Sequence, residues 1–166
     1  VLGCREGSLR ELHVTASRLL AGTANLAEAF IEAELAYEAQ RIEINPFLVP
    51  YVKAYRDAGG KVILLTDMYM HAEHVSRLLD LLGLPPESYD FLISSADTKV
   101  SKASGGIFPL VEEDMQAEPD RFVHLGDSFR GDVAQPMRCG WQALHLPLSE
   151  YDVLARRRDH VETQDM

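Results

Sequence analysis

The sequence predicts an α/β fold, a three-layer sandwich with a mainly parallel sheet that follows an N-terminal helical segment. Two observations predict it. Helical spacing of apolar residues fills residues 9–57, and short apolar runs then alternate with amphipathic stretches as far as residue 146. Repeated strand–helix units of this length imply parallel strands that are joined by right-handed crossovers.

The N-terminal helices are predicted from apolar spacing and from the residues at their ends. Ser8 is a candidate N-cap for a helix over residues 9–20, and a second helix is expected over residues 25–41. A third helix is expected over residues 46–57, because a proline at its start and two glycines after its end suit a helix. In the first helix Leu9, Leu12, Leu19 and Leu20 fall roughly on one face, and in the second Leu26, Phe30, Ile31 and Leu35 are expected to face inward.

Four short apolar runs are predicted to be the strands of a Rossmann-like sheet. The run at residues 61–66 is almost continuously apolar, which is typical of a strand buried on both faces. The strands are expected at residues 61–66, 91–95, 121–125 and 141–146. Helices are expected over residues 72–82 and 105–115, after Asp132 as far as Cys139, and over residues 149–160.

Composition restricts the classes of function. A chain of 166 residues is long enough for one domain with a core, and its net charge of −10 argues against nucleic acid or an anionic membrane as a partner. No apolar run approaches the roughly 20 residues that span a bilayer. The two cysteines, Cys4 and Cys139, are too few for a disulfide framework. We therefore expect a protein of the reducing cytoplasm.

Polar residues that suit phosphate chemistry follow three of the predicted strands. Thr66 and Asp67 come after the first strand, Lys102 soon after the second, and Asp127 and Asp132 after the third. Because parallel sheets bind ligands beyond the carboxyl ends of their strands, we expect these side chains to converge at one edge. A hydroxyl and an ammonium suit phosphate oxygens, and two carboxylates suit Mg²⁺.

Each of these residues also has a purely structural interpretation. Thr66 would end a strand, Asp67 would cap the next helix, and the candidate lysine would be a solvated loop residue with Lys99 as a nearby rival. Asp127 and Asp132 would form an Asx-turn and a helix N-cap. The alternatives stay open for each residue taken alone.

Four further features have simpler explanations than a site. His71 and His74 are expected in a solvated first helical turn, because no third metal ligand is evident beside them. His124 is expected to be a packed or hydrogen-bonded strand residue, and Trp141 a core residue. The arginines at residues 156–158 are expected to form a solvated helix face.

Taken together, three motifs resemble those of the haloacid dehalogenase-like (HAD) superfamily. Thr66 in LLTDMYM is similar to its second motif, Lys102 in SKASGGIF to its third, and GDSFRGD at residues 126–132 to its fourth. The resemblance covers residues 44–147. It implies a HAD-like α/β core over residues 44–166 and a helical cap-like segment over residues 1–43.

The resemblance implies a Mg²⁺-dependent hydrolase that cleaves a small phosphate monoester through an aspartyl-phosphate. In that interpretation Thr66, Asp67 and Lys102 bind the substrate, and Thr66 and Lys102 also take part in catalysis. Asp127 would bind Mg²⁺, with Asp132 supporting or bridging it.

One motif of that family has no counterpart. The family's first motif, Asp-x-Asp, supplies the nucleophile and the acid–base group at the end of the central first strand, yet the first aspartate here is Asp57. The resemblance places that strand between residues 61–66 and 121–125. We therefore expect the central strand to be missing from this sequence and the chain alone to be inactive. Because Val1 is not an initiator methionine, we expect part of a longer protein rather than a natural loss.

Other classes of function stay open. One is a non-catalytic HAD-like binding or regulatory module, completed by a strand from a partner. A receiver domain would need an acceptor carboxylate on an earlier strand, and a dinucleotide-binding domain would need G-x-G-x-x-G; the sequence has neither. The expected partner is a small phosphorylated substrate. A fused or partner domain stays open, since similar predicted hydrolases are sometimes attached to glycosyltransferases, and so does a homo-oligomer.

Overall fold

The computed structural model describes residues 7–150 and 153–154 of the chain. These residues divide into two compact units, an N-terminal unit that ends at Ser101 and a C-terminal unit that begins at Lys102. Each unit has its own pair of parallel strands. The expected boundary between residues 43 and 44 stays a prediction. Within the described residues, no helix combines the length and the apolar character needed to cross a bilayer.

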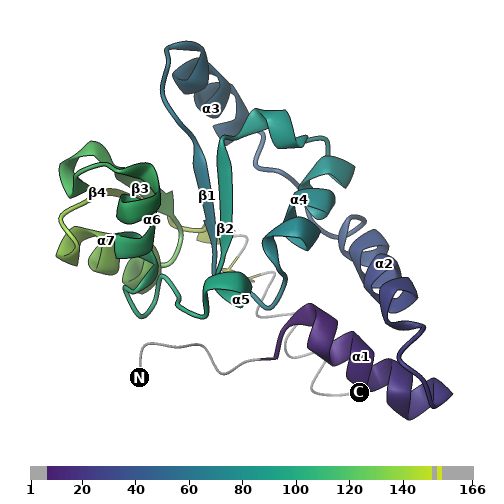
Figure 1. Cartoon of the computed structure of the whole chain (residues 1–166). Helices are drawn as coiled ribbons and strands as arrows, with labels where there is room; N and C mark the ends of the chain where they lie inside the picture. Colours follow the sequence, from purple (N-terminus) through teal and green to yellow (C-terminus); the bar gives the residue numbers. More distant parts are fainter. Residues whose placement is uncertain (1–6, 151–152, 155–166) are drawn as a thin grey trace. The chain divides into compact units, whose positions relative to one another are not determined.

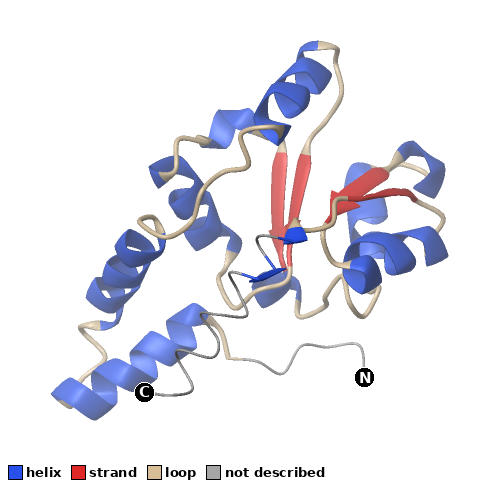
Figure 2. Cartoon of the chain, turned by 180° about the vertical axis from the view of Figure 1, so that it is seen from behind, coloured by secondary structure: helices blue, strands red, loops and turns tan. Residues whose placement is uncertain are grey.

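The N-terminal unit combines helices with one pair of parallel strands. β1 and β2 run side by side in Figure 1 and form one of the two red pairs in Figure 2. Their register aligns Ile63 with Phe91 and Thr66 with Ser94, so both strands end at the same edge. The elements of this unit are α1 (Leu9–Ala21), α2 (Ala27–Glu38), α3 (Leu48–Asp57), β1 (Ile63–Thr66), α4 (Ala72–Leu81), η1 (Pro86–Ser88), β2 (Phe91–Ser94) and α5 (Ser95–Thr98).

α1 begins where the sequence predicts, because Ser8 caps it. The Ser8 hydroxyl accepts the Glu11 N–H, and the Glu11 carboxylate accepts the Ser8 N–H at 2.7 Å, which together make a capping box. Gly22 ends the helix with a φ of 71°, which glycine adopts without steric cost. The Leu9 amide also donates to the Tyr69 carbonyl at 2.8 Å. The start of α1 is therefore joined to the loop after β1.

Most of the leucines predicted to share one face of α1 are exposed. Leu9 is fully buried, but Leu12, Leu19 and Leu20 are between 52% and 81% exposed. The buried face carries Ser17 instead, whose hydroxyl is hydrogen-bonded to the backbone of the turn between α1 and α2. Helical spacing shows which side chains share a face, but it does not show whether another element covers that face.

The core of the N-terminal unit lies among α1, α2 and α4. Ile31 and Leu35 of α2 are buried as predicted, whereas Leu26, just before the helix, is 42% exposed. Figure 1 shows α1 and α2 joined by a short turn. The buried cluster consists of Leu9, Ile31, Leu35, Met70, Val75 and Leu78.

β1 is shorter and less buried than the sequence predicts. It covers four residues, and all four are half-buried, so the expectation of a strand buried on both faces is wrong for the described residues. Phe91 at the start of β2 is 41% exposed. In a doubly wound fold both faces of a parallel sheet are covered, so the partial exposure marks a sheet that the described residues cover incompletely.

The C-terminal unit contains the second pair of parallel strands. β3 and β4 pair with Val123 opposite Gln142 and Gly126 opposite His145. Figure 1 shows α6 and α7 beside them. The elements are α6 (Ile107–Met115), η2 (Pro119–Arg121), β3 (Val123–Gly126), the π-helix η3 (Phe129–Ala134), α7 (Gln135–Arg138) and β4 (Gln142–His145). The fully or largely buried apolar residues are Ile107, Phe108, Val111, Val133, Pro136 and Trp141.

Parallel strand pairing and helical crossovers confirm the predicted α/β class. The helix expected to start after Asp132 begins earlier, because Ser128 caps η3 by accepting the Gly131 N–H at 3.2 Å. Of the helix expected over residues 149–160, Ser149, Glu150, Val153 and Leu154 are described, and all but Ser149 are helical. The arginines at residues 156–158 and Cys4 lie outside the described residues.

Candidate active site

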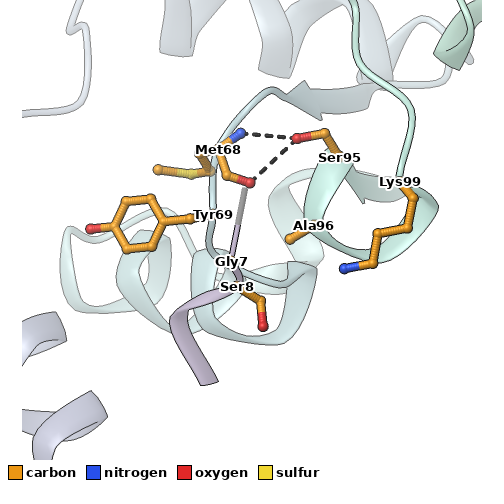
Figure 3. Close-up of a pocket in the computed structure, with 7 residues that line it drawn as sticks. All are labelled: Gly7, Ser8, Met68, Tyr69, Ser95, Ala96 and Lys99. Carbon is orange, nitrogen blue, oxygen red and sulfur yellow. Dashed lines mark hydrogen bonds between the residues drawn. The ribbon is translucent and has the colours of Figure 1, made fainter. Parts of the chain in front are cut away.

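The loop after β1 is held by Ser94, the last residue of β2, and by Ser95, the first residue of α5. Thr66 is half-buried at the end of β1, and Asp67 is exposed in the next position. The Ser95 hydroxyl accepts the Met68 N–H at 3.1 Å and lies 3.3 Å from the Met68 carbonyl (Figure 3). The Ser94 hydroxyl donates to the Met70 carbonyl at 2.6 Å. Sequence reasoning missed both serines as loop contacts, although neighbouring hydroxyls at the end of a strand are a usable signal for such contacts.

The cavity beside this loop is too small for a substrate. Its volume is about 10 Å³, which is about the space of one water molecule. Figure 3 shows that the loop after β1, α5 and the start of α1 all contribute to its wall. The lining residues are Gly7, Ser8, Met68, Tyr69, Ser95, Ala96 and Lys99. Met68 and Tyr69 therefore line a cavity as well as pack against the core.

A carboxylate joins the loop after β1 to the N-terminal helices. Glu34 of α2 accepts a hydrogen bond from the Tyr69 hydroxyl at 2.7 Å, and its other oxygen lies 2.6 Å from His13 Nε2 of α1. Burial and the neighbouring Glu34 carboxylate raise the pKa of Tyr69 to about 12. Tyr69 comes three residues after Thr66. The helices of residues 9–38 are therefore bonded to the loop that carries a predicted phosphate ligand.

In the C-terminal unit, Asp132 organises the predicted site. Its carboxylate is buried, with only 3% of the side chain exposed, and its Oδ1 lies 2.7 Å from Lys102 Nζ and 2.9 Å from His124 Nε2. Its Oδ2 accepts the Ser128 N–H at 2.9 Å. The structure thus brings together Lys102 and Asp132, two of the predicted residues, and adds His124 and Ser128 to them.

The hydrogen bonds keep Asp132 ionised in spite of its burial. Burial alone would raise the pKa of Asp132, but the hydrogen bonds from Lys102, His124 and the Ser128 amide outweigh it, so the pKa lies below its ordinary value. The negative charge of Asp132 then compensates the ammonium of Lys102, whose side chain is only 16% exposed. A buried lysine beside such a carboxylate is suited to bind an anion without leaving its own charge unpaired.

The backbone around Asp132 is shaped to admit the carboxylate. A Cβ at residue 126 would overlap the Asp132 side chain, so only glycine fits at the end of β3. Asp132 lies inside η3, and its amide donates to the Ser128 carbonyl at 2.7 Å. The structural interpretation of Asp132 as a helix N-cap is wrong, because Ser128 has that role. π-Helical turns are frequent at functional sites.

His124 is packed on its other sides by aromatic rings. The centroid of its ring lies 5.7 Å from that of Phe108 and 6.4 Å from that of Trp141, and both pairs of rings are T-shaped. Trp141 in turn donates its indole N–H to Glu112 at 2.7 Å and stacks on Phe122. The prediction of a packed, hydrogen-bonded strand histidine and a core tryptophan is confirmed.

Of the two predicted metal-binding carboxylates, Asp127 is placed to be the one direct ligand of Mg²⁺. Asp127 is exposed at the end of β3, and its backbone carbonyl lies 3.1 Å from His145 Nε2. The oxygens of Asp132 already accept hydrogen bonds from three groups. Mg²⁺ keeps several waters and often takes only one or two protein carboxylates. Among the described residues no group of three His, Cys, Asp or Glu side chains forms a metal site.

His71 and His74 are not in a solvated helical turn as predicted. His74 is only 4% exposed, and its Nδ1 is buried without a hydrogen-bond partner among the described residues. His71 Nδ1 lies 2.6 Å from the Asp97 carboxylate, which also accepts the Ala72 amide at 2.8 Å. Asp97 of α5 thus satisfies the first turn of α4.

Thr66 and Asp67 belong to the N-terminal unit, and Lys102, Asp127 and Asp132 to the C-terminal unit. Within the C-terminal unit the predicted lysine and carboxylates do lie around one strand end. The convergence of Thr66 and Asp67 with them, and all of their assigned roles, stay predictions.

Comparison with known proteins places the chain in a family. The model of the haloacid dehalogenase-like hydrolase family matches residues 6–134. Of the curated proteins, the chloroplastic adenylosuccinate synthetase of Chlamydomonas reinhardtii is 27% identical over 155 residues, which cover 75% of this chain and 33% of that protein. The chain thus spans about a third of the length of this curated relative.

Two solved structures with a similar fold are a HAD phosphatase and a haloacid dehalogenase. A HAD phosphatase from Thermococcus onnurineus superposes with a TM-score of 0.58 at 19% identity, over 86% of this chain and 78% of that one. The L-2-haloacid dehalogenase from Xanthobacter autotrophicus, with chloropropionic acid covalently bound, has a TM-score of 0.57 at 21% identity, over 89% and 56% of the two chains. At these identities the likeness shows the fold. With the family match over more than half of its length, the chain belongs to the haloacid dehalogenase-like hydrolase family.

Proposed function

We propose that this chain supplies the phosphate-binding and metal-binding part of a Mg²⁺-dependent phosphate monoesterase of the HAD type. The observation that carries the proposal is the ion pair of the half-buried Lys102 with the buried Asp132, 2.7 Å apart, beside the Gly-Asp turn at the end of β3. A lysine held by a carboxylate at a strand end is suited to neutralise a transferring phosphoryl group. The family match supports the hydrolase class.

Each predicted residue has a role in this proposal. Lys102 would hold phosphate oxygens together with the Thr66 hydroxyl, and Asp67 would contact the substrate. Asp127 would ligate Mg²⁺ directly, while Asp132 would support the site by holding Lys102. Bound Mg²⁺ would neutralise phosphate charge.

The printed sequence contains no Asp-x-Asp, so the covalent step needs a nucleophile from another segment or another chain. In such a step a carboxylate oxygen bonds to phosphorus while the bond from phosphorus to the ester oxygen breaks, and water then releases phosphate. We expect the chain alone to show little or no turnover. We place this reaction in the cytoplasm, with a small phosphorylated compound as the substrate.

Turnover of an aryl phosphate tests the proposal. The chain and its Asp127→Ala variant are incubated with the substrate and Mg²⁺, and released phosphate is measured. We expect neither protein to exceed the buffer control. Turnover that Asp127→Ala abolishes would contradict the expected inactivity and would require a nucleophile among the printed residues.

A second candidate function is a non-catalytic binding module that a partner strand completes. The Phe122 and Gly126 carbonyls accept the Gln142 and Leu146 amides, so the backbone groups of Val123 point to the opposite edge of β3. No further strand of the described residues pairs with that edge. Open edges of this kind accept added strands.

Ligand binding without chemistry would favour this second function. Melting temperature is measured with Mg²⁺ and phosphate, together and singly, alongside the turnover assay. An increase in melting temperature when both are present, with no turnover even in a preparation that contains the completing strand, would support a binding module over an enzyme.

A further inference from the structure

We propose that His124 is a positioning residue of the phosphate site, which fixes the Asp132 carboxylate in the orientation that places the Lys102 ammonium. This proposal rests on the proposed function, because it assumes that Lys102 binds phosphate, and it adds how Lys102 is held in place. In the sequence His124 directly precedes the Leu-Gly-Asp of the fourth motif, and it was expected to be a packed or hydrogen-bonded strand residue with no assigned role at the site.

One carboxylate oxygen receives both side chains. Oδ1 of Asp132 lies 2.7 Å from Lys102 Nζ and 2.9 Å from His124 Nε2. An ionised carboxylate only accepts hydrogen bonds, so His124 Nε2 must carry a hydrogen in this arrangement. The second oxygen is occupied by the Ser128 amide at 2.9 Å. Rotation of the carboxylate would break all three bonds at once.

The donor itself is rigid. His124 is 9% exposed, and Phe108, with no exposed surface, meets its ring nearly at right angles, with an interplanar angle of 79°. Trp141 contacts the same ring and is held by its own hydrogen bond to Glu112. Side chains that are locked by packing hold the groups they contact with little loss of entropy on ligand binding. The direction of the Nε2–H bond is thus set by β3 and α6.

His124 acts through Asp132 and not on a ligand. Its ring lies against Phe108 and Trp141, and its Nε2 is taken up by Asp132 Oδ1, so the contacts of the ring are with the carboxylate and the aromatic core. Without the His124 hydrogen bond, Oδ1 would be held by Lys102 alone, and the carboxylate would follow the ammonium. The geometry of Lys102 would then be less sharply defined.

This role is tested by the exchange rate of the Lys102 ammonium hydrogens with water. The rate is measured by NMR at one fixed pH, on ¹⁵N-lysine-labelled protein without substrate. Lys102→Met identifies the signal. In the wild type we expect exchange slower than that of Lys53, whose side chain is 74% exposed. His124→Leu should accelerate it about tenfold, the effect of losing one hydrogen bond to a charged group. His124→Gln, which keeps a donor, should restore the slow rate, and the matched control His145→Leu should leave it unchanged.

Three results would overturn the proposal. The first is a Lys102 exchange rate that is unchanged in His124→Leu while the melting temperature falls, because His124 would then serve packing alone. The second is wild-type Lys102 exchange as fast as that of Lys53. The third does not depend on a folded variant: ¹⁵N spectra of wild-type His124 that show hydrogen on Nδ1 and none on Nε2. Since no substrate is present, failure of the hydrolase proposal in the turnover assay would leave this result standing.

Discussion

At the scale of single residues, Gly126 and Asp132 depend on each other. The end of β3 approaches the Asp132 carboxylate so closely that no side chain fits at residue 126. The carboxylate is short, buried and held by three hydrogen bonds, so it cannot move aside at low cost. Glycine, which has no side chain, is therefore needed at residue 126 for the hydrogen-bonded charge network of Asp132 to form.

Gly126→Ala should destabilise the chain by about 1–3 kcal/mol, the usual cost of forcing an extra methyl group into a packed site. The measurement is the free energy of unfolding by urea. Gly131→Ala is the matched control, because a Cβ there would make only ordinary contacts, with the Ser128 hydroxyl at 3.4 Å and Lys102 Cβ at 3.6 Å. Equal effects of the two substitutions would contradict the close approach of Gly126 to Asp132.

His74 is a second residue whose environment has a measurable consequence. Burial lowers the pKa of His74; Glu73 opposes this shift, and Arg10 adds to it. His74 therefore binds its proton at a lower pH in the folded protein than in the unfolded chain, where its pKa has the ordinary value of 6.5. The stability that neutral His74 contributes is complete above pH 6.5 and is lost as the pH falls through the lowered pKa.

His74→Leu should accordingly gain stability relative to the wild type as the pH falls from 8 to 5. Leucine has no buried nitrogen to protonate, so the variant should lack this part of the acid sensitivity. Unfolding free energies of both proteins are compared across that range. A difference between the two proteins that is the same at pH 8 and pH 5 would show that His74 does not resist protonation in the fold.

At the scale of elements, the loop after β1 links a strand end to two helices. The Tyr69 carbonyl accepts a hydrogen bond from the Leu9 amide of α1, and the Tyr69 hydroxyl donates one to Glu34 of α2. These bonds lie three residues from Thr66, so movement of the helices would reach the proposed phosphate ligand through a short segment of backbone. The raised pKa of Tyr69 is an observable sign of that contact.

Tyr69→Phe should remove a tyrosine that ionises near pH 12 from the absorbance titration. The neutral hydroxyl contributes stability fully below pH 10, and that contribution is lost as the pH rises from about 10 to about 12. At neutral pH the variant should lose about 1 kcal/mol or less, since one partly exposed hydrogen bond is removed. Tyr51→Phe, at a side chain that is 75% exposed, is the control. Retention of the late titration in Tyr69→Phe would contradict the assignment.

The elements show how far sequence patterns reach. Strands were predictable because four short apolar runs are followed by polar or turn residues, and the N-cap at Ser8 was predictable because a serine precedes the first leucine of a helical pattern. The exposed leucines of α1 were not, because amphipathic spacing does not reveal whether a face is covered. α5 was missed because four residues after a strand are too few to show a period.

For the candidate site, the sequence likewise predicted some of the residues but not how they contact one another. Lys102 and Asp132 were both predicted as polar residues that come after strands, and the structure brings them together within the C-terminal unit. The contribution of His124 depends on side-chain alternation in β3 and on a ring orientation that Phe108 and Trp141 determine. That Asp132 serves the lysine through buried hydrogen bonds depends on the π-helical turn after Ser128, which no spacing in the sequence indicates.

At the scale of the whole molecule, the chain belongs to the HAD-like hydrolase family and still has no Asp-x-Asp. It is strongly acidic, with a net charge of −10, so a phosphate ligand must be bound by local cations or Mg²⁺ against the overall charge. Lys102, paired with a buried carboxylate, and the exposed Asp127 are the groups that we propose for these two tasks.

Binding of inorganic phosphate, measured by calorimetry with and without Mg²⁺, tests this central claim most directly, because it needs no nucleophile. We predict Mg²⁺-dependent binding that weakens about tenfold or more in Lys102→Met and in Asp127→Asn, since each variant removes a charged contact. Lys53→Met, at an exposed lysine, should bind like the wild type. Equal phosphate affinity in all four proteins, or affinity that is unaffected by Mg²⁺, would contradict the account.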